Sequence, residues 1–158
     1  MTKYTYTEKK IHNAEYRTHV RPELLDEICE QILRKMIVEK KYRDTSYTAR
    51  QLAQDIGTNV RYISAAVNLR FGMNYPELVG GYRVREAAAL LADRRHVGKT
   101  MGQIAQECGF SSRQSFYATF YKTYGKTPKE YQASYLVRTA DKVKADKEKQ
   151  KRKLKVDN

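Results

Sequence analysis

The sequence predicts an all-α fold of about seven helices, and three observations carry this prediction. Apolar residues recur three and four positions apart, the spacing of one helix face, and no segment of the central region alternates as a strand would. Helix-start patterns such as Thr48 with Gln51, and glycines such as Gly57, bracket the periodic segments. A seven-residue block also occurs twice, 52 residues apart.

The first predicted helix covers residues 22–41. Pro22 suits a first helical turn, and apolar residues then recur along one face. That face comprises Leu25, Ile28, Ile32 and Met36, widened by Leu24, Leu33 and Ile37. Residues 1–20 have no firm period and are expected to form a flexible leader.

The remaining helices follow from caps and glycines. Thr48, Asn59, Asn74, Thr100, Ser112 and Thr127 are suitable N-caps, and Gly57, Gly72, Gly109 and Gly125 are suitable ends. The predicted helices cover residues 48–57, 59–70, 75–94, 100–109, 112–125 and a segment that begins at 127.

The repeated block relates two of these helix pairs. Residues 51–57, QLAQDIG, recur as residues 103–109, QIAQECG, and each copy is followed by a longer helix. A short helix, a turn at glycine and a longer helix form the helix-turn-helix layout. The apolar positions that correspond in the two longer helices are Ile63 and Val67 in one and Phe116 and Phe120 in the other. We expect these side chains to face the core and the residues between them to face outward.

The outward positions carry side chains that suit base recognition. The N-terminal part of the second helix of this motif enters the major groove of DNA. Arg pairs with guanine, Gln with adenine, and small residues allow close approach to thymine methyl groups. An exposed Arg or Gln taken alone is more often an ordinary solvated residue. Two copies of one scaffold that present such residues together favour DNA contact.

Charge supports a polyanionic partner. The chain has 31 basic and 18 acidic residues, a net charge of +13. Residues 138–158 hold nine basic and four acidic residues, so residues 1–137 still carry +8. We expect this basic tail to be solvated and disordered, or a fraying helix, with a non-specific phosphate-binding arm as the alternative.

Other classes of protein are excluded or disfavoured. The longest apolar run, Ala87 to Ala92, is too short to span a membrane, and no signal peptide is visible. Cys29 and Cys108 cannot form a disulfide scaffold and are expected to be buried, inert thiols. No catalytic constellation, metal-ligand spacing or cofactor motif appears, so we predict no enzyme activity, no metal and no cofactor.

Residues 52–131 resemble the AraC/XylS-type DNA-binding domain. The matching segments are NVRYIS at 59–64, FGMNY at 71–75, RVREAAALL at 83–91, IAQECGFSS at 104–112 and GKTPKEY at 125–131. The segment GTNVRYIS at 57–64 is most similar to members from Bacteroidetes.

The resemblance implies a domain over 21–137, with helix-turn-helix units at about 48–72 and 100–125. A linker helix over about 75–94 joins the units, with a length that suits consecutive major grooves. The implied base contacts are Arg61, Ser64 and Ala65 in the first unit and Arg113, Gln114, Tyr117 and Ala118 in the second. Lys99, Lys122, Lys126 and Lys129 are candidates for phosphate contacts. Ala65 and Ala118 replace the Arg of other members, which implies less direct readout.

The resemblance further implies a sequence-specific transcriptional regulator that binds double-stranded DNA. We expect an activator that also contacts RNA polymerase in the bacterial cytoplasm, associated with the nucleoid, and not with a membrane. No small-molecule effector domain is visible, and Met1 favours a free-standing regulator over a fragment. The alternatives are a non-specific architectural DNA-binding protein and a protein-interaction module that has lost DNA readout.

Overall fold

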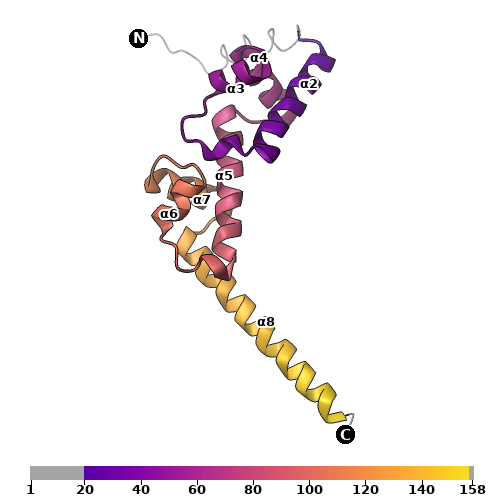
Figure 1. Cartoon of the computed structure of the whole chain (residues 1–158), viewed down its shortest axis with the longest axis vertical. Coiled ribbons are helices and arrows are strands. Elements are labelled where there is room, and N and C mark those ends of the chain that lie inside the picture. Colours follow the sequence, from indigo (N-terminus) through magenta and orange to yellow (C-terminus); the bar gives the residue numbers. More distant parts are fainter. Residues whose placement is uncertain (1–19, 157–158) are drawn as a thin grey trace, which may run out of the picture. The chain divides into compact units, whose positions relative to one another are not determined.

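The computed structural model describes residues 20–156, and within this range it contains seven α-helices and no strand (Figure 1). The all-α prediction is therefore confirmed, while the leader predicted for residues 1–20 lies outside the described residues except for Val20. The α-helices are α2 (Pro22–Leu33), α3 (Ala49–Ile56), α4 (Val60–Ala66), α5 (Tyr75–Ala92), α6 (Met101–Glu107), α7 (Arg113–Tyr124) and α8 (Pro128–Val156).

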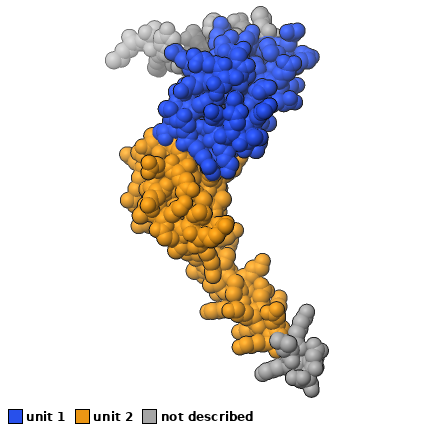
Figure 2. Space-filling model, viewed as in Figure 1, with its two compact units in different colours: residues 1–82 blue, residues 83–158 orange. Residues whose placement is uncertain are grey.

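The chain divides into two compact units, residues 1–82 and 83–158, each with its own apolar core (Figure 2). The first core gathers α2, α3 and α4 around Ile32, Leu52 and Ile63. The second gathers α6 and α7 around Phe116 and Phe120. Helix α5 is continuous across the boundary and contributes side chains to both cores, namely Leu78 and Val79 to the first and Val84, Ala87, Ala88 and Leu91 to the second.

The first helix differs from its prediction at its C-terminal end. Helix α2 ends at Leu33 and continues as one π-helical turn, η1 (Arg34–Val38). A π turn holds more residues than an α turn and rotates the following side chains around the axis. Ile37, predicted to widen the buried face, is consequently 58% exposed, whereas Met36 is fully buried.

The predicted caps are present at the helix starts. Thr48 and Gln51 form a reciprocal capping box at α3, and Thr100 and Gln103 form the same box at α6. In each box the N-cap hydroxyl accepts a backbone N–H while the Gln side chain accepts the N-cap N–H, which satisfies two unpaired donors of the first turn. These local bonds explain why both repeats begin their first helix at the same position.

The tail is helical. Of the two states expected for it, disorder and a fraying helix, residues 138–156 adopt the helical one and continue helix α8 without a break. Lys, Glu, Gln, Arg and Ala have high helix propensity, and no Gly or Pro interrupts residues 129–156. Such a composition is compatible with a helix even where it buries little apolar surface.

Candidate nucleic-acid interface

The first helix-turn-helix consists of α3 and α4. Gly57 lies between them in the left-handed conformation, with φ of 78°, and the N–H of Thr58 donates to the carbonyl of Ala53 at 2.8 Å. Asn59 then caps α4, since its side-chain oxygen accepts the N–H of Tyr62 at 3.0 Å. This sequence of bonds ends one helix and starts the next within three residues.

The second helix-turn-helix repeats this construction with α6 and α7. Gly109 has φ of 90°, and the N–H of Phe110 donates to the carbonyl of Ala105 at 2.9 Å. Ser112 caps α7, with its hydroxyl oxygen accepting the N–H of Ser115 at 3.1 Å. The matching residues Leu52 and Ile104, Ala53 and Ala105, Ile63 and Phe116, and Val67 and Phe120 are all buried. The repeat detected in the sequence is therefore a structural repeat.

The outward face of α4 is narrower than predicted. Val60, Arg61 and Ser64 are exposed, as expected for a helix that presents its N-terminal turns. Ala65, however, is only 5% exposed and belongs to the core of the first unit, so the prediction that it faces outward is wrong. The physical reason is tertiary packing, because Ala65 belongs to the core that α4 shares with α2 and α3.

The outward face of α7 agrees with the prediction. Arg113, Gln114 and Ala118 are exposed, and Tyr117 is half-buried against the ring of Phe116. The Arg113 guanidinium lies 5.2 Å from the centre of the Tyr117 ring, and its Nη2 donates to the Tyr117 hydroxyl at 3.4 Å. Four polar or small side chains thus share one face of the N-terminal two turns.

Tyr121 is an exposed aromatic residue of α7 that was not among the predicted DNA contacts. Tyr121 is 58% exposed, one turn beyond Tyr117 on the same side of the helix. Its position four residues after Tyr117 is the signal that was available in the sequence. A tyrosine exposed this far offers both a ring and a hydroxyl to a partner.

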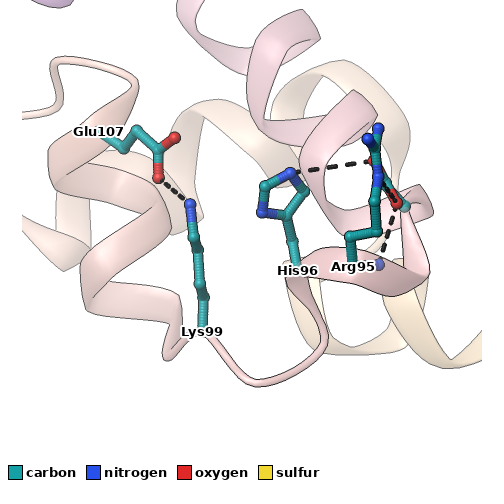
Figure 3. A network of polar contacts seen from close by, with 5 residues as sticks. Arg95, His96, Lys99 and Glu107 are labelled. Atoms are coloured by element: carbon teal, nitrogen blue, oxygen red, sulfur yellow. Dashed lines mark hydrogen bonds and ion pairs between the residues drawn. The ribbon is translucent and has the colours of Figure 1, made fainter.

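The predicted phosphate contacts divide into two groups. Lys122, Lys126 and Lys129 are exposed around the end of α7 and the start of α8. Lys99 instead forms an ion pair with Glu107 at 2.6 Å, which ties the loop before α6 to the end of that helix (Figure 3). To bind a phosphate, the Lys99 ammonium group would have to contact it together with the Glu107 carboxylate or break this ion pair.

A second polar group lies in the same loop. Asp93 accepts two hydrogen bonds from Arg95 Nε and one from Arg95 Nη2, at 2.6–3.1 Å, and one from the Arg95 backbone N–H at 2.9 Å. These bonds lower the pKa of Asp93 to about 2. His96 Nε2 lies 3.8 Å from the same carboxylate (Figure 3). The group caps the short 3₁₀ turn at Arg94–His96 and so fixes the path between α5 and α6.

Metal-binding and membrane-spanning features are absent from the described part of the chain. Within residues 20–156, no group of three His, Cys, Asp or Glu side chains is arranged to hold a metal ion. No helix in that range is long and apolar enough to cross a membrane. Cys29 and Cys108 are both buried at core positions, as predicted, and burial raises the pKa of the Cys29 thiol.

The two repeats, each with exposed side chains on the N-terminal turns of its second helix, define a helix-turn-helix domain. A family model described as "Helix-turn-helix domain" matches residues 52–134, just over half of the chain. The probable transcriptional regulator LumQ of Photobacterium leiognathi is 30% identical over 109 residues, which are 69% of this chain and 39% of LumQ. This chain thus spans about two fifths of the length of that curated relative.

Solved structures agree on the fold. The C-terminal domain of the two-component response regulator yesN from Fusobacterium nucleatum is 26% identical, with a TM-score of 0.57 over 65% of this chain and 97% of that domain. The DNA-binding domain of AdpA, a global transcriptional factor solved with a target DNA, is 20% identical, with a TM-score of 0.60 over 70% of this chain and 94% of that one. The chain belongs to the AraC-type helix-turn-helix family of transcriptional regulators. The resemblance to the AraC/XylS-type DNA-binding domain is therefore confirmed, and the similarity to members from Bacteroidetes stays a prediction.

Proposed function

We propose that this chain is a sequence-specific regulator that places α4 and α7 in successive major grooves of double-stranded DNA. The observation that supports it most strongly is the structural repeat: two capped helices each present an exposed arginine in their first turns. Arg donates two hydrogen bonds to guanine O6 and N7, the commonest specific contact in the major groove. A scaffold that repeats this arrangement is suited to reading two short blocks of sequence.

The proposed base-reading residues follow the exposed faces. They are Arg61 and Ser64 on α4, and Arg113, Gln114, Tyr117 and Ala118 on α7. Ala65 is left out because its side chain is buried in the first core. Helix α7 thus offers two long donors and a tyrosine hydroxyl, whereas α4 offers one long donor and one hydroxyl. We therefore expect the block of sequence read by α7 to be the more selective of the two.

Phosphate contacts would supply most of the affinity and little of the selectivity. We assign them to Lys122, Lys126 and Lys129, which are exposed beside α7. Lys99 takes a smaller part because its ammonium group is paired with Glu107. The DNA-binding domain in this proposal covers residues 21–137.

The proposed biological role is one that membership of this family suggests. We infer an activator of transcription that also contacts RNA polymerase, acting at the nucleoid in the bacterial cytoplasm. The family of regulators to which the chain belongs supports this role.

Selection of genomic fragments by the purified full chain at ~150 mM salt tests the proposal, since phosphate-only binding is weakened at such salt. The double variant Arg61→Ala, Arg113→Ala is run in parallel. A matched control is Arg21→Ala, Arg34→Ala, which removes the same charge from exposed positions at and after α2.

The expected result is a motif of two blocks about one helical turn apart, recovered by the wild type and the control but not by the double variant. Equal recovery of all fragments by all three proteins would support the architectural DNA-binding alternative. Recovery of no DNA at all would support the protein-interaction alternative.

A further inference from the structure

The second half of α8 is a basic helical segment that the rest of its unit does not cover. The first turns of α8 are docked: the Tyr131 ring lies 5.3 Å from the Phe120 ring, and Pro128 is fully buried. Arg94 Nη2 also donates to Thr139 Oγ1 at 3.4 Å. From Asp141 to Arg152, by contrast, every side chain is exposed.

Residues 138–152, which include this exposed segment, carry more positive than negative charge. Residues 138–152 contain seven basic and three acidic side chains. Lys144, Lys147 and Lys151 are three and four residues apart and therefore share one side of the helix. Arg138, Lys142 and Lys149, at spacings of four and seven, share another. None of these six basic groups forms an ion pair with the described residues of the chain.

The side chains present argue against two other partners for this segment, a membrane surface and a second copy of the same helix. A membrane-surface helix needs a broad face of bulky apolar residues. Val143 is the only bulky apolar side chain between Asp141 and Arg152. A coiled coil with a second copy needs an apolar seam, but the positions that continue from Val143 on that side are Lys147 and Gln150. Two such helices would also repel each other, because both are positively charged.

We propose that residues 138–152 of α8 form a further DNA-contacting element, in addition to α4 and α7, which binds backbone phosphates through lysine and arginine without reading bases. Phosphate contact requires basic side chains and no apolar anchor, which matches the composition of this segment. Fifteen helical residues extend over about 22 Å, while duplex DNA carries one phosphate charge per ~1.7 Å of its axis. The inference rests on the DNA binding proposed above and extends it to a sequence-independent contact.

The test measures binding of the full chain to a mixed-sequence 40-base-pair duplex by fluorescence anisotropy between about 50 and 200 mM KCl. The test variant is Lys144→Gln, Lys147→Gln, Lys151→Gln, because Gln and Lys have similar helix propensity. The matched control is Lys144→Arg, Lys147→Arg, Lys151→Arg, which keeps the charge. Circular dichroism checks that both variants retain the helix content of the wild type.

We expect the Gln variant to bind about tenfold more weakly at 150 mM salt, with a salt slope shallower by ~2–3, or roughly one for each phosphate that the variant no longer neutralises. The Arg variant should match the wild type. The proposal is overturned if the Gln variant keeps the affinity and slope of the wild type. It is equally overturned if the three lysines instead support binding to phosphatidylserine vesicles while DNA binding stays unchanged.

These outcomes are separable from a failure of the proposed function. A wild-type chain that shows the expected lysine dependence but selects no motif contradicts sequence-specific regulation alone. If the wild type selects a motif but the Gln variant has the same salt slope as the wild type, only the proposed role of α8 is contradicted.

Discussion

The guanidinium of Arg113 lies 5.2 Å from the ring centre of Tyr117, one turn further along α7, and donates to its hydroxyl at 3.4 Å. Tyr117 is itself held, because its ring packs edge-on against the buried ring of Phe116 at 5.7 Å. A core residue thus supports a half-buried tyrosine, which in turn restrains an exposed arginine. An arginine with fewer rotamers loses less entropy when it binds a base.

Replacement of Tyr117 should therefore weaken recognition through Arg113. We expect Tyr117→Leu, which removes both the ring and the hydroxyl, to reduce affinity for the selected motif by about 1 kcal/mol, roughly fivefold. Tyr117→Phe keeps the ring beneath the guanidinium and should lose less. Anisotropy titrations with the motif and with a duplex altered in the block read by α7 measure both affinity and preference.

The effect of Tyr117→Leu on DNA affinity is also measured in a chain in which Arg113 is replaced by Ala. In an Arg113→Ala chain, Tyr117→Leu should have a smaller effect than in the wild type if the two residues act together. Equal effects in both backgrounds would show that Tyr117 contacts DNA or supports the fold independently of Arg113.

The two equivalent alanines of the repeat should respond differently to enlargement. Ala65 is 5% exposed in a packed core, so Ala65→Leu should destabilise the first unit by about 1–3 kcal/mol. Ala118 is exposed, and Ala118→Leu should change stability by no more than about 0.5 kcal/mol. Thermal and urea unfolding measure the difference, and similar losses in both variants would contradict the assignment of these faces.

The turn glycine of the first unit should be intolerant of a side chain. Gly57 has φ of 78°, a conformation that costs an L residue about 1–2 kcal/mol, so Gly57→Ala should lower the unfolding midpoint. Gly98→Ala is the control, because a Cβ there meets open space and its φ lies outside the left-handed region. Equal midpoints for the two variants would contradict the turn geometry.

The free energy of unfolding should depend on pH through the carboxylate of Asp93. Its pKa is lowered from 3.8 to about 2, chiefly by hydrogen bonds from the Arg95 side chain and backbone. A lowered pKa means that the ionised form stabilises the folded state. This stabilising contribution is complete at pH values above the ordinary pKa of 3.8, and it is lost as the pH falls through the folded-state pKa of about 2.

Asp93→Asn should accordingly unfold at a lower urea concentration than the wild type at pH 7. The difference between the two urea midpoints should become smaller as the pH is lowered from 4 to 2. Asp146→Asn, which changes the same charge on the exposed part of α8, is the control. A gap for Asp93→Asn that stays constant over this range would contradict the role of the carboxylate.

The sequence predicted the features that local chemistry determines. The boxes at Thr48 and Thr100 and the left-handed Gly57 and Gly109 depend on residues close together in the chain, so pattern alone located both helix-turn-helix units. The burial of Ala65 depends on the core that α4 shares with α2 and α3, and the helical period of α4 alone does not reveal it. The one local hint is the apolar run Ala65, Ala66, Val67, since the second repeat has Ala118, Thr119, Phe120 at the equivalent positions.

The π turn at Arg34–Val38 was likewise not predicted, because the apolar residues up to Met36 and Ile37 keep the three- and four-residue spacing of an ordinary α-helix. For residues 138–156 the sequence left disorder and a fraying helix open. High charge and few apolar residues favour disorder, whereas the helix propensity of the same residues favours the observed α8.

In the proposed complex, α4 and α7 each read their own block of DNA. The most direct measurement is motif selection with the single variants Arg61→Ala and Arg113→Ala, each compared with the wild type at ~150 mM salt. We predict that each variant loses base preference in one block only, and that the two affected blocks lie about one helical turn apart. Loss of preference in the same block by both variants, or in neither, would contradict two-block reading.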